Sequence, residues 1–241
     1  SVNSVLSLPM KYCFLQPLFQ TALNPVLHLD GVELLGIRSR THITERVLKA
    51  HPQLLAVGAF CIGTNQIDLP AAAAAGVAVF NAPYSNTRSV VELALGEIIT
   101  LARRLGDRNS SMHAGIWDKS ATGSHEVRGR TLGIVGYGNI GSQLSVLAEG
   151  LGMRVYFYDI VDRLALGNAT RVYSLQELFE RCETITLHVD GRASNAHMIG
   201  EKEFSQMRPR TLFLNLCRGN VVDVDALAAA LRSGHIAGAA V

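Results

Sequence analysis

The stretch Gly136-Tyr-Gly-Asn-Ile-Gly141 decides the fold of this chain. It follows the apolar run Leu132–Val135 and opens a segment with helical spacing of apolar residues, Asn139–Leu151. A second apolar run, Arg154–Tyr158, ends in Asp159, 18 residues after the last glycine. Three glycines alone are a weak signal. A dinucleotide-binding βαβ unit typically has a strand before the glycines, a helix after them and an acidic residue about 20 residues further on.

Each part of this motif has a physical role. Gly136 permits a tight turn, Gly138 lets a pyrophosphate approach the backbone, and Gly141 lets the helix pack close to the strand. The free N–H groups and the dipole of the helix start favour phosphate. Asp159 accepts hydrogen bonds from ribose hydroxyls and repels a 2′-phosphate, so the motif predicts NAD rather than NADP. A purely structural βα turn is the alternative, and the position of Asp159 weighs against it.

The same alternation of apolar runs and helix-like segments continues to the end of the chain and predicts a Rossmann-type, doubly wound parallel sheet. The expected strands are 131–135, 154–158, 184–189, 211–216 and 236–241, and the expected helices are 139–151, 174–182, 201–207 and 224–233. A smaller α/β unit is predicted in the first half, with strands at 12–16, 33–37, 54–58 and 77–80 and helices capped by Thr44 and Asp68. A long helix is expected over 89–105, followed by a polar surface segment over 107–130.

Composition narrows the function classes. Of 241 residues, 48% are hydrophobic and 17% charged, which is typical of a globular protein, and the net charge of +2 argues against a nucleic-acid partner bound through bulk charge. The four cysteines, at 13, 61, 182 and 217, lack metal-knuckle or CxxC spacing, so we expect no metal site and a reducing, cytoplasmic setting. No signal peptide is expected at the start, and Ala71–Phe80 is too short to span a membrane.

Two longer stretches, Arg128–Gly141 and Leu214–Asp223, resemble the D-2-hydroxyacid dehydrogenase family. Gly36–Thr41, Phe60–Asp68 and Phe80–Ser89 are similar to the branch of that family that oxidises 3-phospho-D-glycerate. The resemblance runs from about Gly36 to Val241. It implies NAD-dependent formation of 3-phosphohydroxypyruvate, which is the first step of phosphorylated serine biosynthesis.

The resemblance also implies residue roles on the cofactor side. Asn139, Ile140 and Asp159 are expected to contact NAD, and Leu216, Cys217 and Arg218 to line the cofactor and the reacting carbon. Arg218 would bind the substrate carboxylate and polarise the C2 oxygen, a role that suits a planar fork of donors. A surface arginine is the alternative, but its place at the carboxyl end of a parallel strand favours function. His188 ends another strand near the cleft and could border the cofactor.

On the substrate side, the resemblance places an anion site at Arg38, Ser39 and Arg40, whose short-range donors suit a phosphate. A polar, solvated strand end is the alternative for these three residues. Asn86, with Arg88 nearby, is a further candidate substrate contact. We therefore expect a flavodoxin-like substrate domain over 1–85 and the NAD domain over 86–241, including the helix 89–105. A homodimer or homotetramer is expected, without nucleic-acid or membrane partners.

The sequence departs from the family in several places. Asp190 stands where proline is usual, and Cys217 where serine is commoner. The family's acid–base pair, a glutamate and a histidine in a His-Ile-Gly-Gly-like motif, has no counterpart up to Val241. Two interpretations remain open: a truncated protein, or a sequence that covers only part of a longer chain. The second is favoured because a missing helix would leave apolar sheet surface uncovered, at roughly 25 cal/mol per Å².

Three other functions remain as alternatives. A sister dehydrogenase for glyoxylate, hydroxypyruvate or 2-oxoglutarate would not need two arginines around Ser39. An NAD(H)-sensing corepressor on the same fold would bind cofactor and partner peptides with negligible turnover. A catalytically inactive fragment would bind NAD only.

Overall fold

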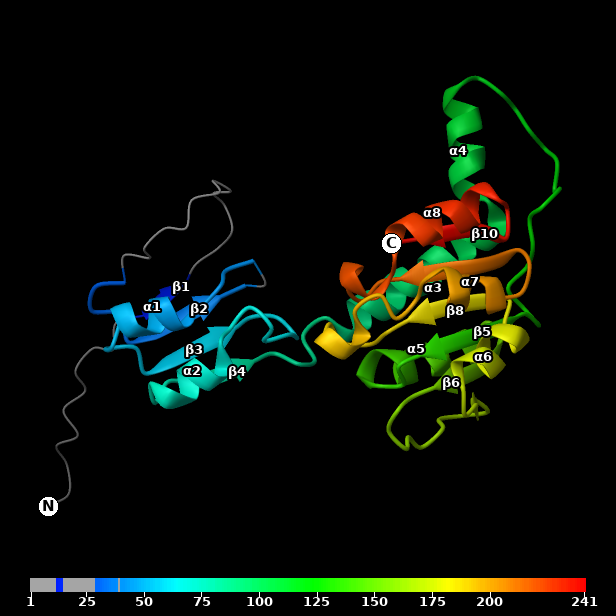
Figure 1. The fold of residues 1–241 in the computed structure, drawn as a ribbon. Coiled ribbons are helices and arrows are strands. Elements are labelled where there is room, and N and C mark those ends of the chain that lie inside the picture. The colour runs from blue at the N-terminus through cyan, green and yellow to red at the C-terminus, as the bar shows by residue number, and fades with distance from the viewer. Residues whose placement is uncertain (1–11, 15–28, 39) are drawn as a thin grey trace, which may run out of the picture. The chain divides into compact units, whose positions relative to one another are not determined.

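A computed structural model of the chain describes residues 12–14, 29–38 and 40–241 (Figure 1). The chain divides into two compact units, Ser1–Asn86 and Thr87–Val241. Each unit is an α/β structure built on its own parallel sheet.

In the first unit, four parallel strands lie side by side in chain order. They are β1 (Tyr12–Phe14), β2 (Leu34–Ile37), β3 (Ala56–Ala59) and β4 (Ala78–Asn81), joined by α1 (Glu45–Ala50) and α2 (Leu69–Ala74). The Asp68 side chain caps α2 as predicted, accepting the Ala71 N–H at 3.1 Å. Thr44 holds the N-cap position of α1 but makes no side-chain capping hydrogen bond, so only its position was predicted correctly.

The second unit contains a six-stranded parallel sheet in the order β10-β9-β8-β5-β6-β7. The strands are β5 (Thr131–Val135), β6 (Arg154–Tyr158), β7 (Thr170–Arg171), β8 (Thr184–Leu187), β9 (Thr211–Asn215) and β10 (Ile236–Ala240). The helices are α3 (Thr87–Arg103), α4 (Leu105–His113), α5 (Asn139–Gly150), α6 (Leu175–Arg181), α7 (Glu201–Gln206) and α8 (Val224–Arg232), with short 3-10 turns at Ala193–Asn195 and Gly219–Val221. This is the Rossmann order, with the topological switch between β5 and β8. The predicted fold class is confirmed.

Helices cover both faces of this sheet, as β9 shows. Phe213 packs with Phe204 of α7 on one face, their rings 5.1 Å apart, whereas Leu214 packs with Ile98 of α3 and Leu144 of α5 on the other. All five residues of β9 are buried. Burying each such large apolar side chain contributes roughly 1.5–3 kcal/mol, so uninterrupted apolar strands fix the three-layer arrangement.

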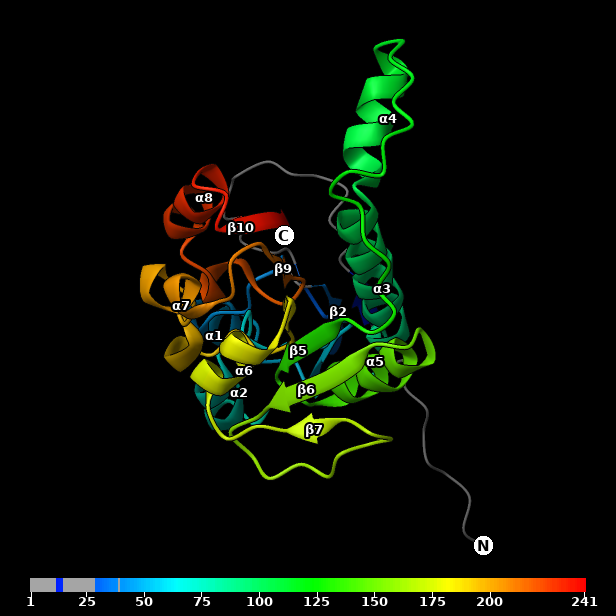
Figure 2. The same cartoon turned by 90° about the vertical axis from the view of Figure 1, so that its right-hand side faces the viewer.

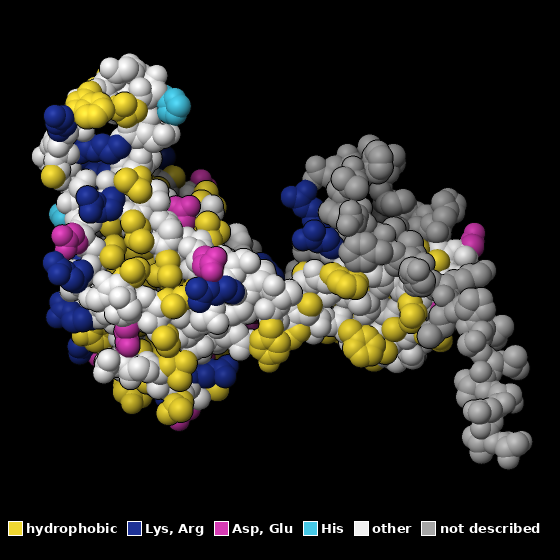
Figure 3. Space-filling view, turned by 180° about the vertical axis from the view of Figure 1, so that it is seen from behind, with side chains coloured by type: hydrophobic (Ala, Val, Ile, Leu, Met, Phe, Trp, Pro, Cys, Tyr) yellow, Lys and Arg dark blue, Asp and Glu magenta, His cyan; other side chains and the backbone are white. Residues whose placement is uncertain are grey.

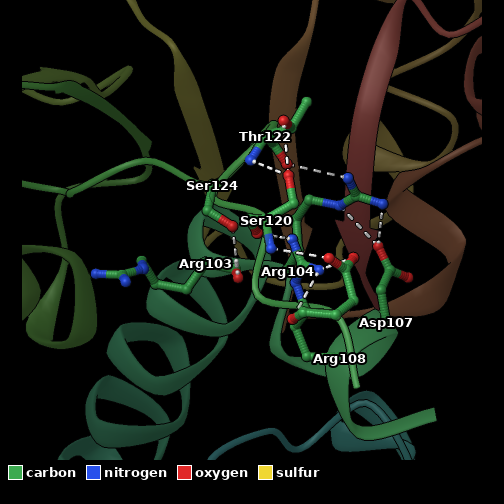
Figure 4. Close-up of polar contacts among 8 residues, drawn as sticks. Arg103, Arg104, Asp107, Arg108, Ser120, Thr122 and Ser124 are labelled. Atoms are coloured by element: carbon green, nitrogen blue, oxygen red, sulfur yellow. Dashed lines mark hydrogen bonds and ion pairs between the residues drawn. The ribbon is translucent and has the colours of Figure 1, made fainter. Parts of the chain in front are cut away.

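The predicted helix 89–105 was wrong at its end, and α4 was not predicted. Arg104 takes the left-handed conformation, with φ 54°, and separates α3 from α4. No residue of α4 is buried, so its sequence has no apolar period to reveal it. Polar contacts with the returning segment, residues 118–122, hold it: Arg104 Nη1 donates to the Thr122 carbonyl at 3.4 Å, and Arg108 donates to the Asp118 carboxylate and to the Ser120 carbonyl (Figure 4).

The α4 helix projects from the rest of its unit (Figure 2). On the face that Figure 3 shows, the basic side chains of the second unit lie among hydrophobic, acidic and neutral ones. Within the described residues, no helix has the length and hydrophobicity that crossing a bilayer requires.

Candidate functional site

The glycine motif occupies the turn from β5 into α5, next to the carboxyl end of β8. Gly136 has φ +93°, and a Cβ there would lie 2.7 Å from the His188 carbonyl oxygen. A Cβ on Gly141 would lie 2.2 Å from the Gly136 carbonyl oxygen. At Gly138, by contrast, a Cβ would meet no atom within 4 Å. Two glycines are therefore required by close packing, and the third borders open space.

That open space lies at the N-cap position of α5. Gly138 is the N-cap and has no side chain to accept the first N–H groups of the helix. Those groups, beginning with Asn139 and Ile140, have no intrahelical acceptor because of helix geometry. Together with the helix dipole they form a site for an anion. The turn thus fits the pyrophosphate of a dinucleotide.

Asp159 follows β6 at the same edge of the sheet. Its Oδ2 accepts the Tyr137 N–H at 2.7 Å, its Oδ1 accepts the Val161 N–H at 2.8 Å, and its side chain is only 10% exposed. The Arg163 Nε lies 3.8 Å from Oδ2. An ionised carboxylate has about four acceptor positions, so these two bonds leave room for two more. Asp159 is therefore held in place and can still accept ribose hydroxyls.

His188 follows β8, is half-buried and carries a neutral imidazole. Its Nε2 lies 3.0 Å from Thr186 Oγ1, and its buried Nδ1 has no hydrogen-bond partner among the described residues. Burial lowers the pKa of His188 from 6.5 to about 4, so the ring is uncharged at neutral pH. A buried polar atom without a protein partner is usually bound by ordered water or by an ion or ligand.

Arg218 lies just after the carboxyl end of β9, so it shares the edge that carries the glycine turn, Asp159 and His188. The side chain of Arg218 is exposed, and its Nη1 donates to the Cys217 carbonyl at 2.9 Å. Leu216 and Cys217 are half-buried. Burial raises the pKa of the Cys217 thiol, which keeps it protonated at neutral pH.

The predicted substrate residues lie in the first unit and the predicted NAD residues in the second. Arg38 and Arg40 follow β2, and both are exposed without an ion-pair partner among the described residues. Ser39 lies outside the described residues. Asn86 is exposed and is the last residue of its unit. Arg88 pairs with Glu92 one turn along α3, Nε to Oε1 at 2.7 Å.

A cavity of about 560 Å³ lies elsewhere in the second unit, at the opposite edge of the sheet. Arg130, Glu183 and Arg210, which line it, directly precede β5, β8 and β9. It therefore borders the amino ends of the strands and contains none of the predicted site residues.

Two residues that support the site were missed by the sequence predictions. Tyr137 acts through its backbone N–H, which fixes Asp159 and which no side-chain pattern can reveal. Thr186 holds the imidazole of His188. Side chains alternate between the two faces of a strand, so residues two apart lie on the same face. This alternation could have predicted Thr186 as the partner of His188.

Comparisons with known proteins identify the family of this chain. The family described as D-isomer specific 2-hydroxyacid dehydrogenase, NAD binding domain, matches residues 95–241. D-3-phosphoglycerate dehydrogenases of Haemophilus influenzae and Escherichia coli K12 are each 55% identical over 213 residues, which is 88% of this chain and 52% of theirs. The chain thus spans about half the length of these curated relatives.

Solved structures of 2-hydroxyacid dehydrogenases have the same fold. D-lactate dehydrogenase from Aquifex aeolicus, complexed with NAD and lactic acid, superposes with a TM-score of 0.81 at 30% identity, over 89% of this chain and 65% of that one. D-2-hydroxyisocaproate dehydrogenase gives 0.80 at 28%, over 89% and 66%. The chain therefore belongs to the D-isomer specific 2-hydroxyacid dehydrogenase family, and its second unit carries that family's NAD-binding domain.

Proposed function

We propose that the protein oxidises 3-phospho-D-glycerate to 3-phosphohydroxypyruvate with NAD. The observation that supports this choice of substrate is the 55% identity with proteins named D-3-phosphoglycerate dehydrogenase. Arg38 and Arg40, exposed and without ion-pair partners among the described residues, supply the positive charge that a phosphate needs. The glycine turn and Asp159 support the cofactor.

The proposal gives the cofactor-side residues binding and orienting roles. The N–H groups at Asn139 and Ile140 hold the pyrophosphate, and Asp159 accepts the ribose hydroxyls. His188, Leu216 and Cys217 border the cofactor. NAD, when bound, supplies the acceptor for the hydride that leaves C2.

Arg218 holds the substrate in the proposed reaction. Its guanidinium binds the carboxylate and polarises the C2 oxygen as the ketone forms. The hydroxyl proton would pass to the family's acid–base histidine, which has no counterpart up to Val241. Arg38, Ser39 and Arg40 bind the phosphate, and Asn86 contacts the substrate. His188 is not assigned the hydroxyl proton, because a pKa of about 4 makes its ring a weak base at neutral pH.

The test is NADH oxidation, followed by absorbance, with phosphohydroxypyruvate, hydroxypyruvate and 2-oxoglutarate as separate substrates. We expect the highest kcat/KM for phosphohydroxypyruvate. A preference for an unphosphorylated oxo acid would identify a sister dehydrogenase instead. NADH binding without turnover of any oxo acid would favour a cofactor-sensing module.

The phosphate site has its own test. Replacing Arg40 by alanine should raise KM for phosphohydroxypyruvate roughly 10–100-fold, because a hydrogen bond to a charged group contributes about 1.5–3 kcal/mol. KM for hydroxypyruvate should change far less. The control is Arg46→Ala, which removes an exposed arginine from α1. Equal effects of Arg40→Ala on both substrates would remove Arg40 from the phosphate site.

The proposal includes a homodimer or homotetramer in the cytoplasm. Trp117 is 70% exposed and Ile116 58% exposed, close in sequence to α4, none of whose residues is buried. Such apolar groups favour association. Cys61, Cys182 and Cys217 are free thiols, which suits a reducing compartment. Light scattering on the purified protein tests the assembly, and a mass of one chain would contradict it.

A further inference from the structure

One buried side chain ties together the turn that carries Arg218. Asn215 ends β9 and is 7% exposed. Its Oδ1 accepts the Cys217 N–H at 3.3 Å and the Cys217 Sγ–H at 3.0 Å, and its Nδ2 donates to the Arg218 carbonyl at 3.0 Å. One amide therefore binds both residues that follow Leu216, and it binds them only through their backbone and the Cys217 thiol.

The Arg218 side chain is bounded from a second direction. A Cβ on Gly191, in the loop after β8, would lie 3.0 Å from Arg218 Cγ. The aliphatic part of Arg218 thus lies against the Gly191 backbone, while Asn215 holds the peptide from which it starts. Among the described residues, the exposed guanidinium makes one hydrogen bond, to the adjacent Cys217 carbonyl. Its direction is set by the turn rather than by partners at its tip.

We propose that Asn215 is a positioning residue for the dehydrogenase reaction: it fixes the turn from which Arg218 reaches the substrate carboxylate. This inference rests on the proposed function, since it needs Arg218 to bind substrate. The physical reason is that a displacement of about 1 Å in an orienting group can cost on the order of 100-fold in rate. A flexible arginine keeps a useful direction only when its backbone is fixed.

The alternative is a purely structural role at the end of β9. It would involve the same hydrogen bonds, because asparagine commonly binds nearby backbone groups in turns. The two roles differ in their consequences. A strand-ending residue affects stability and leaves the kinetics of the folded enzyme unchanged. A positioning residue affects catalysis through Arg218 alone, so its effect disappears when Arg218 is absent.

The experiment is a double-mutant cycle in the full-length protein, with Asn215→Ala, Arg218→Ala and the double variant. We expect Asn215→Ala to lower kcat/KM for phosphohydroxypyruvate roughly 10–100-fold while the Kd of NADH, measured by fluorescence, stays nearly constant. In the Arg218→Ala background the same change should cost nothing further. Independent, additive losses or a matching loss of NADH affinity would overturn the proposal.

Two further variants sharpen the test. Asn215→Asp keeps an acceptor for the Cys217 N–H but sets an oxygen against the Arg218 carbonyl, so its kcat/KM should fall close to that of Asn215→Ala. Asn220→Ala is the matched control, since Asn220 is an exposed asparagine in the next turn. It should leave kcat/KM unchanged, and a loss equal to that of Asn215→Ala would contradict the proposal.

Hydrogen exchange separates this inference from the proposed function. The Cys217 amide should exchange faster in Asn215→Ala, whereas amides within β5 should not change. If the wild-type protein reduces no oxo acid, the proposed function fails while this local ordering is still measured. Unchanged exchange at Cys217 would overturn the role of Asn215 whatever the activity.

Discussion

At the scale of a residue, we predict that Asp159 determines which cofactor the second unit accepts. Asp159→Asn removes a negative charge whose place is fixed by the Tyr137 and Val161 amides. We expect NADH to bind roughly 10–100-fold more weakly, since bonds to a charged acceptor are lost. NADPH should bind more tightly than to the wild type, because repulsion of the 2′-phosphate ends and Arg163 loses its carboxylate partner. Fluorescence titration with both cofactors measures the change.

A matched charge change nearby provides the control for Asp159. Asp162→Asn removes the same charge three residues later, where the side chain is 90% exposed and pairs with Arg171. It should leave the preference for NADH over NADPH almost unchanged. Equal shifts in the two variants would mean that the overall electrostatic potential of the unit, rather than contact with the ribose, sets the preference for NADH over NADPH.

At the scale of an element, the start of α5 depends on Gly141. Gly141→Ala places a Cβ 2.2 Å from the Gly136 carbonyl oxygen, which is backbone and cannot move without shifting the glycine turn. Such overpacking costs about 1–3 kcal/mol or more. We expect a fall in Tm of roughly 2–4 °C per kcal/mol, together with weaker NADH binding. Calorimetry and NADH titration measure the two effects.

The opposite end of the same helix supplies the comparison. A Cβ on Gly150 would meet no atom within 4 Å, so Gly150→Ala should be neutral or stabilise α5 by up to about 1 kcal/mol. NADH affinity should not change. If Gly141→Ala and Gly150→Ala had the same effects, close packing at the glycine turn would not be what requires Gly141.

At the scale of the whole molecule, His188 makes stability depend on pH. Its pKa is lowered to about 4 in the folded protein and lies near 6.5 in the unfolded chain. Between these values the unfolded chain binds a proton that the folded protein does not. His188 therefore leaves the free energy of unfolding unchanged above about pH 6.5. As the pH drops toward 4, it lowers the free energy of unfolding by up to about 3 kcal/mol.

Urea unfolding at a series of pH values, followed by circular dichroism, measures this contribution. His188→Gln should reduce the loss of unfolding free energy between pH 6.5 and 4, because glutamine does not titrate there. His113→Gln removes an exposed histidine of α4 and should leave the pH dependence as it is. Identical profiles for the wild type and His188→Gln would show that the buried ring does not resist protonation.

The sequence by itself determined the local elements and the motif. Apolar runs buried on both faces, the glycines of the turn and the acidic residue at Asp159 predicted the Rossmann sheet and NAD, because these features follow from short-range sterics and hydrophobic periodicity. Tertiary structure alone decided what lacks such a local signal. The helix α4 has no apolar stripe, and its place is set by the left-handed conformation of Arg104 and by polar contacts. The Tyr137 N–H binds the Asp159 carboxylate, which lies 22 residues further along the chain. Asn215 gains its role only because strand β9 ends there and its amide meets the next two residues, a matter of geometry that composition and spacing do not specify.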